Sequence, residues 1–131
     1  MDSNIAKINF IGRLGLAFVF FYHGLIPKIL WLSPVETQIV LAHEFNVSAH
    51  LISITGGILE ILLAITIILY RHSLVPIYLA GILLIALLID ITLVIPELLT
   101  EAFNPVSINL ACLTLCYLVF LSQEKQTDEY H

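Results

Sequence analysis

The chain has 131 residues, of which 60% are hydrophobic and 11% are charged, and its formal net charge is −5. A soluble globular domain has about 45–50% apolar and about 25% charged residues, so this composition excludes an ordinary soluble fold. The sequence has no basic stripe, which argues against nucleic acid as a partner. It also has no glycine-rich phosphate loop and no Cys/His set with zinc spacing, so it predicts no metal site.

Four apolar runs are each long enough to cross a membrane, because a hydrocarbon core needs roughly 20 apolar residues per helical crossing. They cover residues 9–32, 51–70, 74–96 and 105–122. The first run is longer than the apolar region of a signal peptide, and no small-residue cleavage motif follows it. We therefore predict an all-α fold, a four-helix transmembrane bundle that forms a single integral membrane domain over residues 1–131, with a polar tail at residues 123–131.

The positive charges are unevenly distributed over the predicted connections. Lys7 and Arg13 lie at the start of the first span, Arg71 lies between the second and third, Lys125 follows the fourth, and the connections 33–50 and 97–104 hold no Lys or Arg. Because Lys and Arg concentrate in cytoplasmic loops, this pattern predicts a bacterial inner-membrane protein with cytoplasmic N- and C-termini. We expect Arg13 to pair with lipid phosphate groups or to reach an inward carboxylate.

The first span ends in YHGLIPKILW, which places a histidine, a proline and a lysine inside an otherwise apolar segment. Pro27 has no N–H, so the carbonyl group of His23, four residues earlier, loses its helical hydrogen-bond donor. We therefore expect the helix to be locally broken next to His23 and Lys28. Gly24 is expected to let a neighbouring helix approach closely.

The segment that follows the first span predicts a short helix over residues 34–45. Ser33 at the N-cap, Pro34 at the first helical position and Glu36 two residues later form a capping box. The apolar face predicted for this helix consists of Val35, Ile39, Ala42 and Phe45. We expect an amphipathic helix in the first outer loop, lying on the membrane surface or packed over the mouth of the bundle.

Each of the other three spans carries a polar residue. Gly56, Glu60 and Ala64 share one face of the second span, Asp90 lies in the third, and Asn109 lies within two turns of the start of the fourth, where Asn104 precedes Pro105 as a predicted cap. A rise of 1.5 Å per residue places His23, Glu60, Asp90 and Asn109 in the middle and outer half of the membrane. Cys112 and Cys116 are expected to be buried as small apolar residues.

These polar residues are expensive in lipid, since an ionisable group in hydrocarbon costs at least about 2.5–3.5 kcal/mol. We therefore predict that they turn inward and form one polar cluster that opens to the outer side. The candidate ligand-binding residues are His23, Lys28, Glu60, Asp90, Asn104 and Asn109. Simpler interpretations stay open, because Lys28 can reach the membrane interface and Asn104 can serve only as a cap. The sequence assigns no catalytic residue.

Three segments together resemble a known family. HGLIPKILW in the first span, TGGILEILLA in the second and FNPVSINLA at the start of the fourth are similar, in order and spacing, to the DoxX-like membrane proteins. The resemblance extends from Arg13 to Leu121 and implies a four-helix transmembrane bundle. It marks His23, Pro27, Lys28, Glu60, Asn104 and Asn109 as characteristic positions. The family takes its name from a subunit associated with quinone-linked sulfur oxidation in archaea, and many members are small bacterial inner-membrane proteins without an assigned activity.

Three hypotheses for the function stay open. In the first, the protein is an accessory or scaffold subunit that is not an enzyme on its own, and its outward-opening polar pocket binds a small ligand, a lipid or a partner membrane protein. In the second, it is the membrane subunit of a quinone-linked oxidoreductase, in which His23, Glu60 and Asp90 contact the quinone. In the third, it is a small transporter or proton pathway, which would require a homo-oligomer because four helices rarely enclose a pore.

Overall fold

The computed structural model describes the backbone of residues 3–128 and the side chains of residues 4–124. Over this range the protein is helical and has no strand. Four membrane-spanning segments are formed by α1 (Ser3–Leu25) with the π-helix η1 (Ile26–Leu30), α3 (Ala49–Leu69), α4 (Val75–Val94) and α5 (Pro105–Asp128). The short helices α2 (Pro34–Ala42) and η2 (Pro96–Thr100) lie in the connections before α3 and α5. The predicted fold class, a four-helix transmembrane bundle with a short helix in its first long connection, is confirmed.

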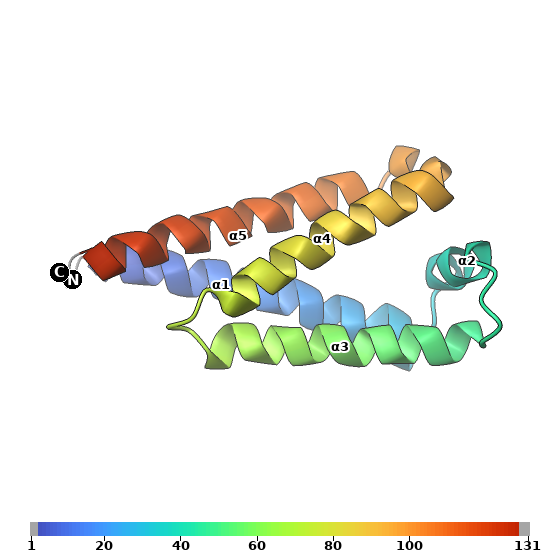
Figure 1. Ribbon diagram of the computed structural model, residues 1–131, viewed down its shortest axis with the longest axis horizontal. Helices are drawn as coiled ribbons and strands as arrows, with labels where there is room; N and C mark the ends of the chain where they lie inside the picture. The colour runs from blue at the N-terminus through green and yellow to red at the C-terminus, as the bar shows by residue number, and fades with distance from the viewer. Residues whose placement is uncertain (1–2, 129–131) are drawn as a thin grey trace.

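The helices form an elongated bundle with two distinct ends (Figure 1). α1 begins and α5 ends at one of them, which we call the termini end, and α2 lies at the other, which we call the α2 end. α1 packs against both α3 and α5, whereas α4 packs mainly against α5. α3 and α4 are joined at the termini end and diverge toward the α2 end, where α2 packs on α3 and reaches α4 (Figure 1).

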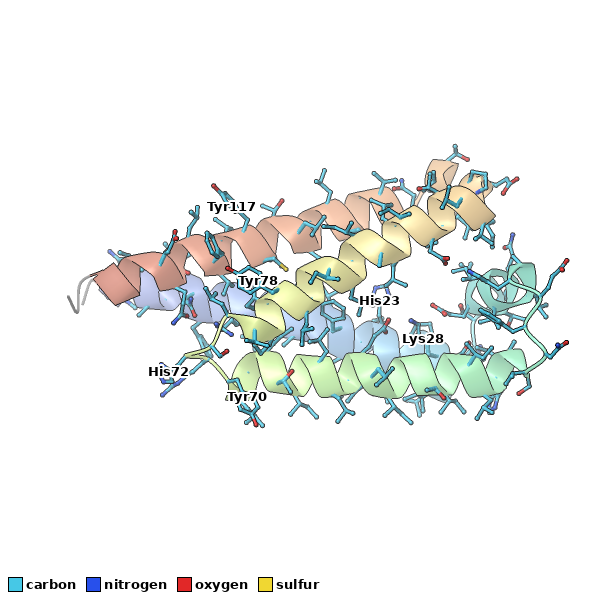
Figure 2. All side chains as sticks on the ribbon, in the orientation of Figure 1. His23, Lys28, Tyr70, His72, Tyr78 and Tyr117 are labelled. Atoms are coloured by element: carbon cyan, nitrogen blue, oxygen red, sulfur yellow. The ribbon has the colours of Figure 1, made fainter. Side chains whose placement is uncertain are left out.

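Three exposed tyrosines mark a level near the termini end. Tyr70 directly follows α3, Tyr78 lies on α4 and Tyr117 lies on α5, and the three are at a similar position along the bundle (Figure 2). Their exposed fractions are 61%, 54% and 60%. Tyrosine and tryptophan concentrate at membrane–water interfaces, so this level fits one edge of the apolar layer. Glu60 precedes Tyr70 by roughly 15 Å of helix, which is about half of a 30 Å hydrocarbon core.

The apolar core fills the bundle between the termini end and the level of His23. Its members come from all four spanning helices and include Leu16, Phe20, Ile67, Leu84 and Val119. Cys112 and Cys116 belong to this core, with 2% and 8% of their surface exposed, and both are free thiols. The prediction that they serve as small buried residues is confirmed.

α1 and α3 approach each other closely where they cross, at Gly24 and Gly57. A Cβ atom added to either glycine would lie 2.5 Å from the carbonyl oxygen of the other, so no larger residue fits without moving a helix. The sequence analysis noted Gly56 on the face of Glu60 and did not consider Gly57. A Cβ on Gly56 would meet no atom within 4 Å among the described residues. Gly57, about 100° further around the helix, is the glycine that faces α1.

The break predicted next to Pro27 is present. α1 ends at Leu25 and continues as the π-helix η1, in which the N–H of Trp31 donates to the carbonyl oxygen of Ile26 at 2.9 Å. Bonds that span five residues instead of four accommodate a residue that cannot donate, and such π-segments are frequent at functional sites. The local widening places Lys28 on the side that faces α3.

The helix starts follow the predicted caps, but two helix ends differ from the prediction. The N–H of Glu36 donates to Ser33 Oγ at 3.1 Å, and the N–H of Ser107 donates to Asn104 Oδ1 at 2.9 Å. α2 ends at Ala42, not at residue 45, because Glu44 adopts a φ of 53°, which is outside the helical region. α5 continues through the predicted polar tail to Asp128, since Gln, Glu and Lys are good helix formers. Residues 129–131 of that predicted tail lie outside the described range.

Candidate functional site

The centre of the candidate site is an ion pair between η1 and α3. Lys28 Nζ lies 2.5 Å from Glu60 Oε1, and both side chains are largely buried, with 13% and 8% of their surface exposed. Lys28 Nζ also lies 3.9 Å from Glu36 Oε1 on α2. One buried ammonium group therefore stands between two carboxylates from two different helices. We call Lys28, Glu60 and Glu36, together with the neighbouring His23, the lysine cluster.

The glycine crossing creates the space for this ion pair. A Cβ atom on Gly24 would lie 3.1 Å from the Cβ of Glu60, and a Cβ atom on Gly57 would lie 3.0 Å from the Cβ of Lys28. Each glycine thus makes room for the first atom of the charged side chain on the opposite helix. Because the two backbones almost touch there, the lysine and the glutamate meet with little freedom to move apart.

Glu60 uses only one of its two carboxylate oxygens in this ion pair. Its Oε2 atom is buried and has no hydrogen-bond partner among the described residues. We call this atom the open acceptor. A buried polar atom without a partner costs about 1–3 kcal/mol, and more if it carries charge. Such an atom calls for a physical explanation, and a water molecule, an ion or a ligand that donates to it would each supply one.

Ser53 lies on the same face of α3, two turns closer to the α2 end. Its side chain is only 3% exposed, and its Oγ atom likewise lacks a hydrogen-bond partner within the part of the chain that the structure describes. The buried face of α3 thus presents two polar oxygens separated by roughly 10 Å of helix. The sequence analysis did not select Ser53, because a serine in an apolar span usually bonds to its own helix.

His23 lies beside this ion pair. It is half-buried on α1, and it interacts electrostatically with both Glu60 and Lys28. Lys28 lies further toward the α2 end than His23 does (Figure 2). Of the six predicted site residues, His23, Lys28 and Glu60 come together.

Asp90 does not join them, because its partner is on α2. His43 Nε2 lies 2.9 Å from Asp90 Oδ1, and His43 Nδ1 lies 2.7 Å from the carbonyl oxygen of Ile39. Both ring nitrogens face acceptors, so both donate only when the imidazole is protonated. The hydrogen bond to Asp90, and then the one to Ile39, raise the pKa of His43.

The two asparagines are also separate from the lysine cluster. Asn109 Nδ2 donates to the carbonyl oxygen of Leu84 at 3.4 Å and ties α5 to α4. Asn104 caps α5 and donates to the carbonyl oxygen of Glu101 at 3.1 Å. The six candidates therefore occupy four separate places, because Asp90, Asn109 and Asn104 each have their own partners, instead of the single cluster that we expected. Sequence depth alone could not separate them, because it does not specify which way each side chain points.

α2 and the residue after it turn a partly polar face toward the bundle, which contradicts the expectation that the apolar face packs over the bundle mouth. Its inward face consists of Glu36, Val40 and His43, which are spaced four and three residues apart. Val35 and Phe45, which belong to the predicted apolar face, are 47% and 56% exposed, so that face does not pack over the mouth of the bundle. The polar side chains turn inward because Lys28 and Asp90 offer them partners. Burial raises the pKa of Glu36, and the positive charge of Lys28 opposes this effect.

This geometry can be compared with known proteins. The model of the DoxX-like family matches residues 17–117, which is most of the chain. The chain belongs to the DoxX-like family. The match includes every residue of the lysine cluster, as well as Asp90 and both asparagines. No curated protein and no solved structure matches the chain.

A second polar group of this DoxX-like protein lies at the termini end and escaped the sequence prediction. Arg13 is 1% exposed and donates to two backbone carbonyl oxygens, that of Ile67 at 3.1 Å and that of Ser73 at 2.9 Å. It also donates to Asn9 Oδ1 at 3.0 Å and to Gln123 Oε1 at 3.4 Å. We call this group the arginine cluster. The expectation that Arg13 reaches lipid phosphate or a carboxylate is wrong, because the last turn of α3 and the following loop supply its acceptors.

Two hollows on the described surface of this family member are lined by residues outside the lysine cluster. One, of about 710 Å³, is an open depression beside Leu32, Thr37 and Leu41 on the outer side of α2. The other, of about 350 Å³, is an apolar groove between α1 and α3 lined by residues such as Ala17, Phe21 and Ile68. Among the described side chains, no group of three His, Cys, Asp or Glu residues could hold a metal ion. The lysine cluster is therefore distinguished by its charges and its open acceptor, not by a large cavity.

Proposed function

We propose that this DoxX-like protein is an accessory or scaffold subunit of the bacterial inner membrane that binds a small ligand, a lipid headgroup or a partner helix at the lysine cluster. The observation that supports the proposal is the open acceptor of Glu60. Charged groups inside a membrane protein are costly and usually mark a binding or transport site. A purely structural ion pair would satisfy its own oxygens, whereas this pair leaves one for an incoming donor.

The energetics of the pair support a functional role over a structural one. Replacing a buried ion pair by apolar residues of similar size is often neutral or even stabilising. A membrane bundle that needed only to hold α1 against α3 could therefore do so with aliphatic side chains. The glycine crossing already brings the two helices together, so the charged pair is not required for their contact.

The site would open toward the α2 end. The Lys and Arg distribution places the termini in the cytoplasm, so the α2 end would face the outer side of the membrane. Reporter fusions test this orientation: a fluorescent protein on the C-terminus should fluoresce, and alkaline phosphatase at the same position should stay inactive. An active phosphatase at the C-terminus would reverse the proposed orientation.

Native mass spectrometry tests the ligand-binding proposal directly. The protein is purified in a mild detergent as wild type, as Glu60→Gln and as Glu101→Gln, the last being an exposed glutamate at the same end that serves as the control. We expect a bound molecule that is retained by wild type and by Glu101→Gln and is lost from Glu60→Gln. Cross-linking from a cysteine introduced into α2 tests whether the bound partner is a protein. If no molecule and no partner depends on Glu60, the proposal is wrong.

The identity of the retained molecule also separates the alternatives. A quinone that depends on Glu60 and His23 would favour a subunit of a quinone-linked oxidoreductase. Proton or solute flux in liposomes that depends on Glu60 would favour a transport pathway. Such flux would require a route past the apolar core, because Leu16, Phe20 and Ile67 pack between the lysine cluster and the termini end.

A further inference from the structure

The charges of the lysine cluster do not balance. Two carboxylates, Glu60 and Glu36, flank the single ammonium group of Lys28. The histidine beside them is neutral unless it takes up a proton, so the ionised cluster carries one excess negative charge. In a low-dielectric interior an uncompensated charge costs several kcal/mol. The cluster is therefore complete only when it gains one positive charge.

The open acceptor specifies where that charge should lie. Glu60 Oε1 is already paired with Lys28, while Glu60 Oε2 is buried and available to a donor. A carboxylate accepts hydrogen bonds at both oxygens, so one glutamate can hold two cations on opposite sides. The resulting order, Glu36, Lys28, Glu60 and an added cation, alternates in sign along its whole length.

The added cation must also donate hydrogen bonds. A quaternary ammonium group would neutralise the charge but would leave the oxygen without a hydrogen bond, and a metal ion would need more ligand side chains than the described residues bring together here. The second buried oxygen on the same face, Ser53 Oγ, lies toward the α2 end and can accept or donate. A small organic amine meets both requirements, because its ammonium group carries the charge and the donors together.

We propose that the lysine cluster binds an ammonium group that donates to Glu60 Oε2, with Ser53 lining the approach from the α2 end. The ammonium group belongs either to a free small amine or to the headgroup of an aminophospholipid. This inference rests on the proposed function and assigns the chemical class of its ligand.

A proton is the natural competitor of this cation. The titratable and charged groups that face the site are His23 on α1, Lys28 on η1, Glu36 on α2 and Glu60 on α3, with His43 and Asp90 at the other end of α2. Burial raises the pKa of Glu36, so Glu36 takes up a proton more readily than an exposed glutamate does. Amine binding should therefore strengthen as the pH rises through the pKa of Glu36.

The test compares amines that differ only in their N–H groups. Full-length protein in detergent is titrated with ethanolamine or with choline, and protein in lipid nanodiscs is compared between phosphatidylethanolamine and phosphatidylcholine. Choline and phosphatidylcholine carry the same positive charge but have no N–H on it. Because a hydrogen bond to a charged group contributes about 1.5–3 kcal/mol, we expect the N–H compound to bind roughly tenfold more tightly or better. The two formats distinguish a free amine from a lipid headgroup.

Variants connect this preference to the site. Glu60→Gln should abolish the preference, Ser53→Ala should weaken it, and Glu101→Gln should leave it unchanged. If Glu60→Gln does not fold, the double variant Lys28→Met with Glu60→Leu replaces it, because it removes both charges. Equal binding of methylated and unmethylated amines, or a preference that survives in the double variant, would overturn the proposal.

The comparison of wild type with Glu60→Gln also separates this inference from the proposed function. If a molecule without an ammonium group is retained by wild type and lost from Glu60→Gln, the amine assignment is wrong but the ligand-binding proposal stands. If water alone fills the site, no added molecule depends on Glu60, and both are wrong.

Discussion

The two polar clusters of this protein solve the same problem in different ways. Each holds a buried cation inside a membrane bundle, with Arg13 at the termini end and Lys28 toward the α2 end. Arg13 donates to backbone carbonyls and amide side chains, and no carboxylate pairs with it among the described residues. Lys28 pairs with two carboxylates and leaves one carboxylate oxygen open. The first cluster is complete in itself, and the second is not.

This difference indicates that the arginine cluster, and not the lysine cluster, stabilises the fold. The last carbonyls of a helix carry partial negative charge and lack helical partners, so a guanidinium at the end of α3 satisfies them and is stabilised in return. It also joins α1, α3, the loop to α4, and α5 in one network. The lysine cluster joins η1, α2 and α3, but the glycine crossing and α2 packing hold those elements independently.

The largest expected effect on stability comes from removing one partner of the Lys28–Glu60 ion pair without the other. Lys28→Met alone leaves Glu60 buried without compensation and should destabilise the protein by about 3–5 kcal/mol. The double variant Lys28→Met with Glu60→Leu should recover most of that loss. Unfolding in mixed micelles with increasing dodecyl sulfate measures both. A double variant as unstable as the single one would show that the pair is structural.

Arg13→Met should cost about 3 kcal/mol, because several charge-assisted hydrogen bonds are lost and their acceptors stay buried. No second substitution can rescue it, since two of the acceptors are backbone carbonyl groups. Arg13→Lys should recover only part of the loss, because one ammonium group cannot reach acceptors that surround a planar guanidinium. The same micelle unfolding assay provides the measurement. Full stability in Arg13→Met would contradict the structural role.

The glycine crossing offers a matched pair of variants. Gly57→Ala should destabilise by about 2 kcal/mol, since a Cβ there meets a backbone oxygen that cannot move without shifting α1. Gly56→Ala places a methyl group in open space and should change stability by less than about 0.5 kcal/mol. Gly57→Ala should also weaken ligand retention. Equal effects of the two substitutions would mean that the crossing is not where the structure places it.

The smallest effect concerns pH and the attachment of α2. The pKa of His43 is raised, so protonated His43 stabilises the folded state below its unfolded pKa of about 6.5, and this contribution is lost as the pH rises through the higher folded value. It should amount to less than about 1 kcal/mol, because the pair is partly exposed. Hydrogen exchange of α2 should therefore quicken with this rise in pH, beyond the intrinsic base dependence of exchange. His43→Gln should remove the extra dependence, and His50→Gln, an exposed control, should keep it.

The fold could be predicted from the sequence because its signals are local. Apolar length identified the four spans, and Ser33 and Asn104 identified two helix starts. The partners within the bundle could not be predicted, because they depend on how the helices are rotated. Glu60 and Asp90 are each the single carboxylate of their span, yet only Glu60 meets Lys28. Gly56 and Gly57 are adjacent, and only the helix crossing distinguishes them. The partners of Arg13 could not be predicted either, since backbone carbonyl groups have no sequence signature.

The central claim is that the lysine cluster is dispensable for folding and necessary for ligand binding. One native mass spectrum of the Lys28→Met, Glu60→Leu double variant tests both parts, because charge states report compactness and mass reports bound molecules. We predict narrow, low charge states like those of wild type, without the wild-type adduct. High, broad charge states, or a compact protein that still carries the adduct, would contradict the claim.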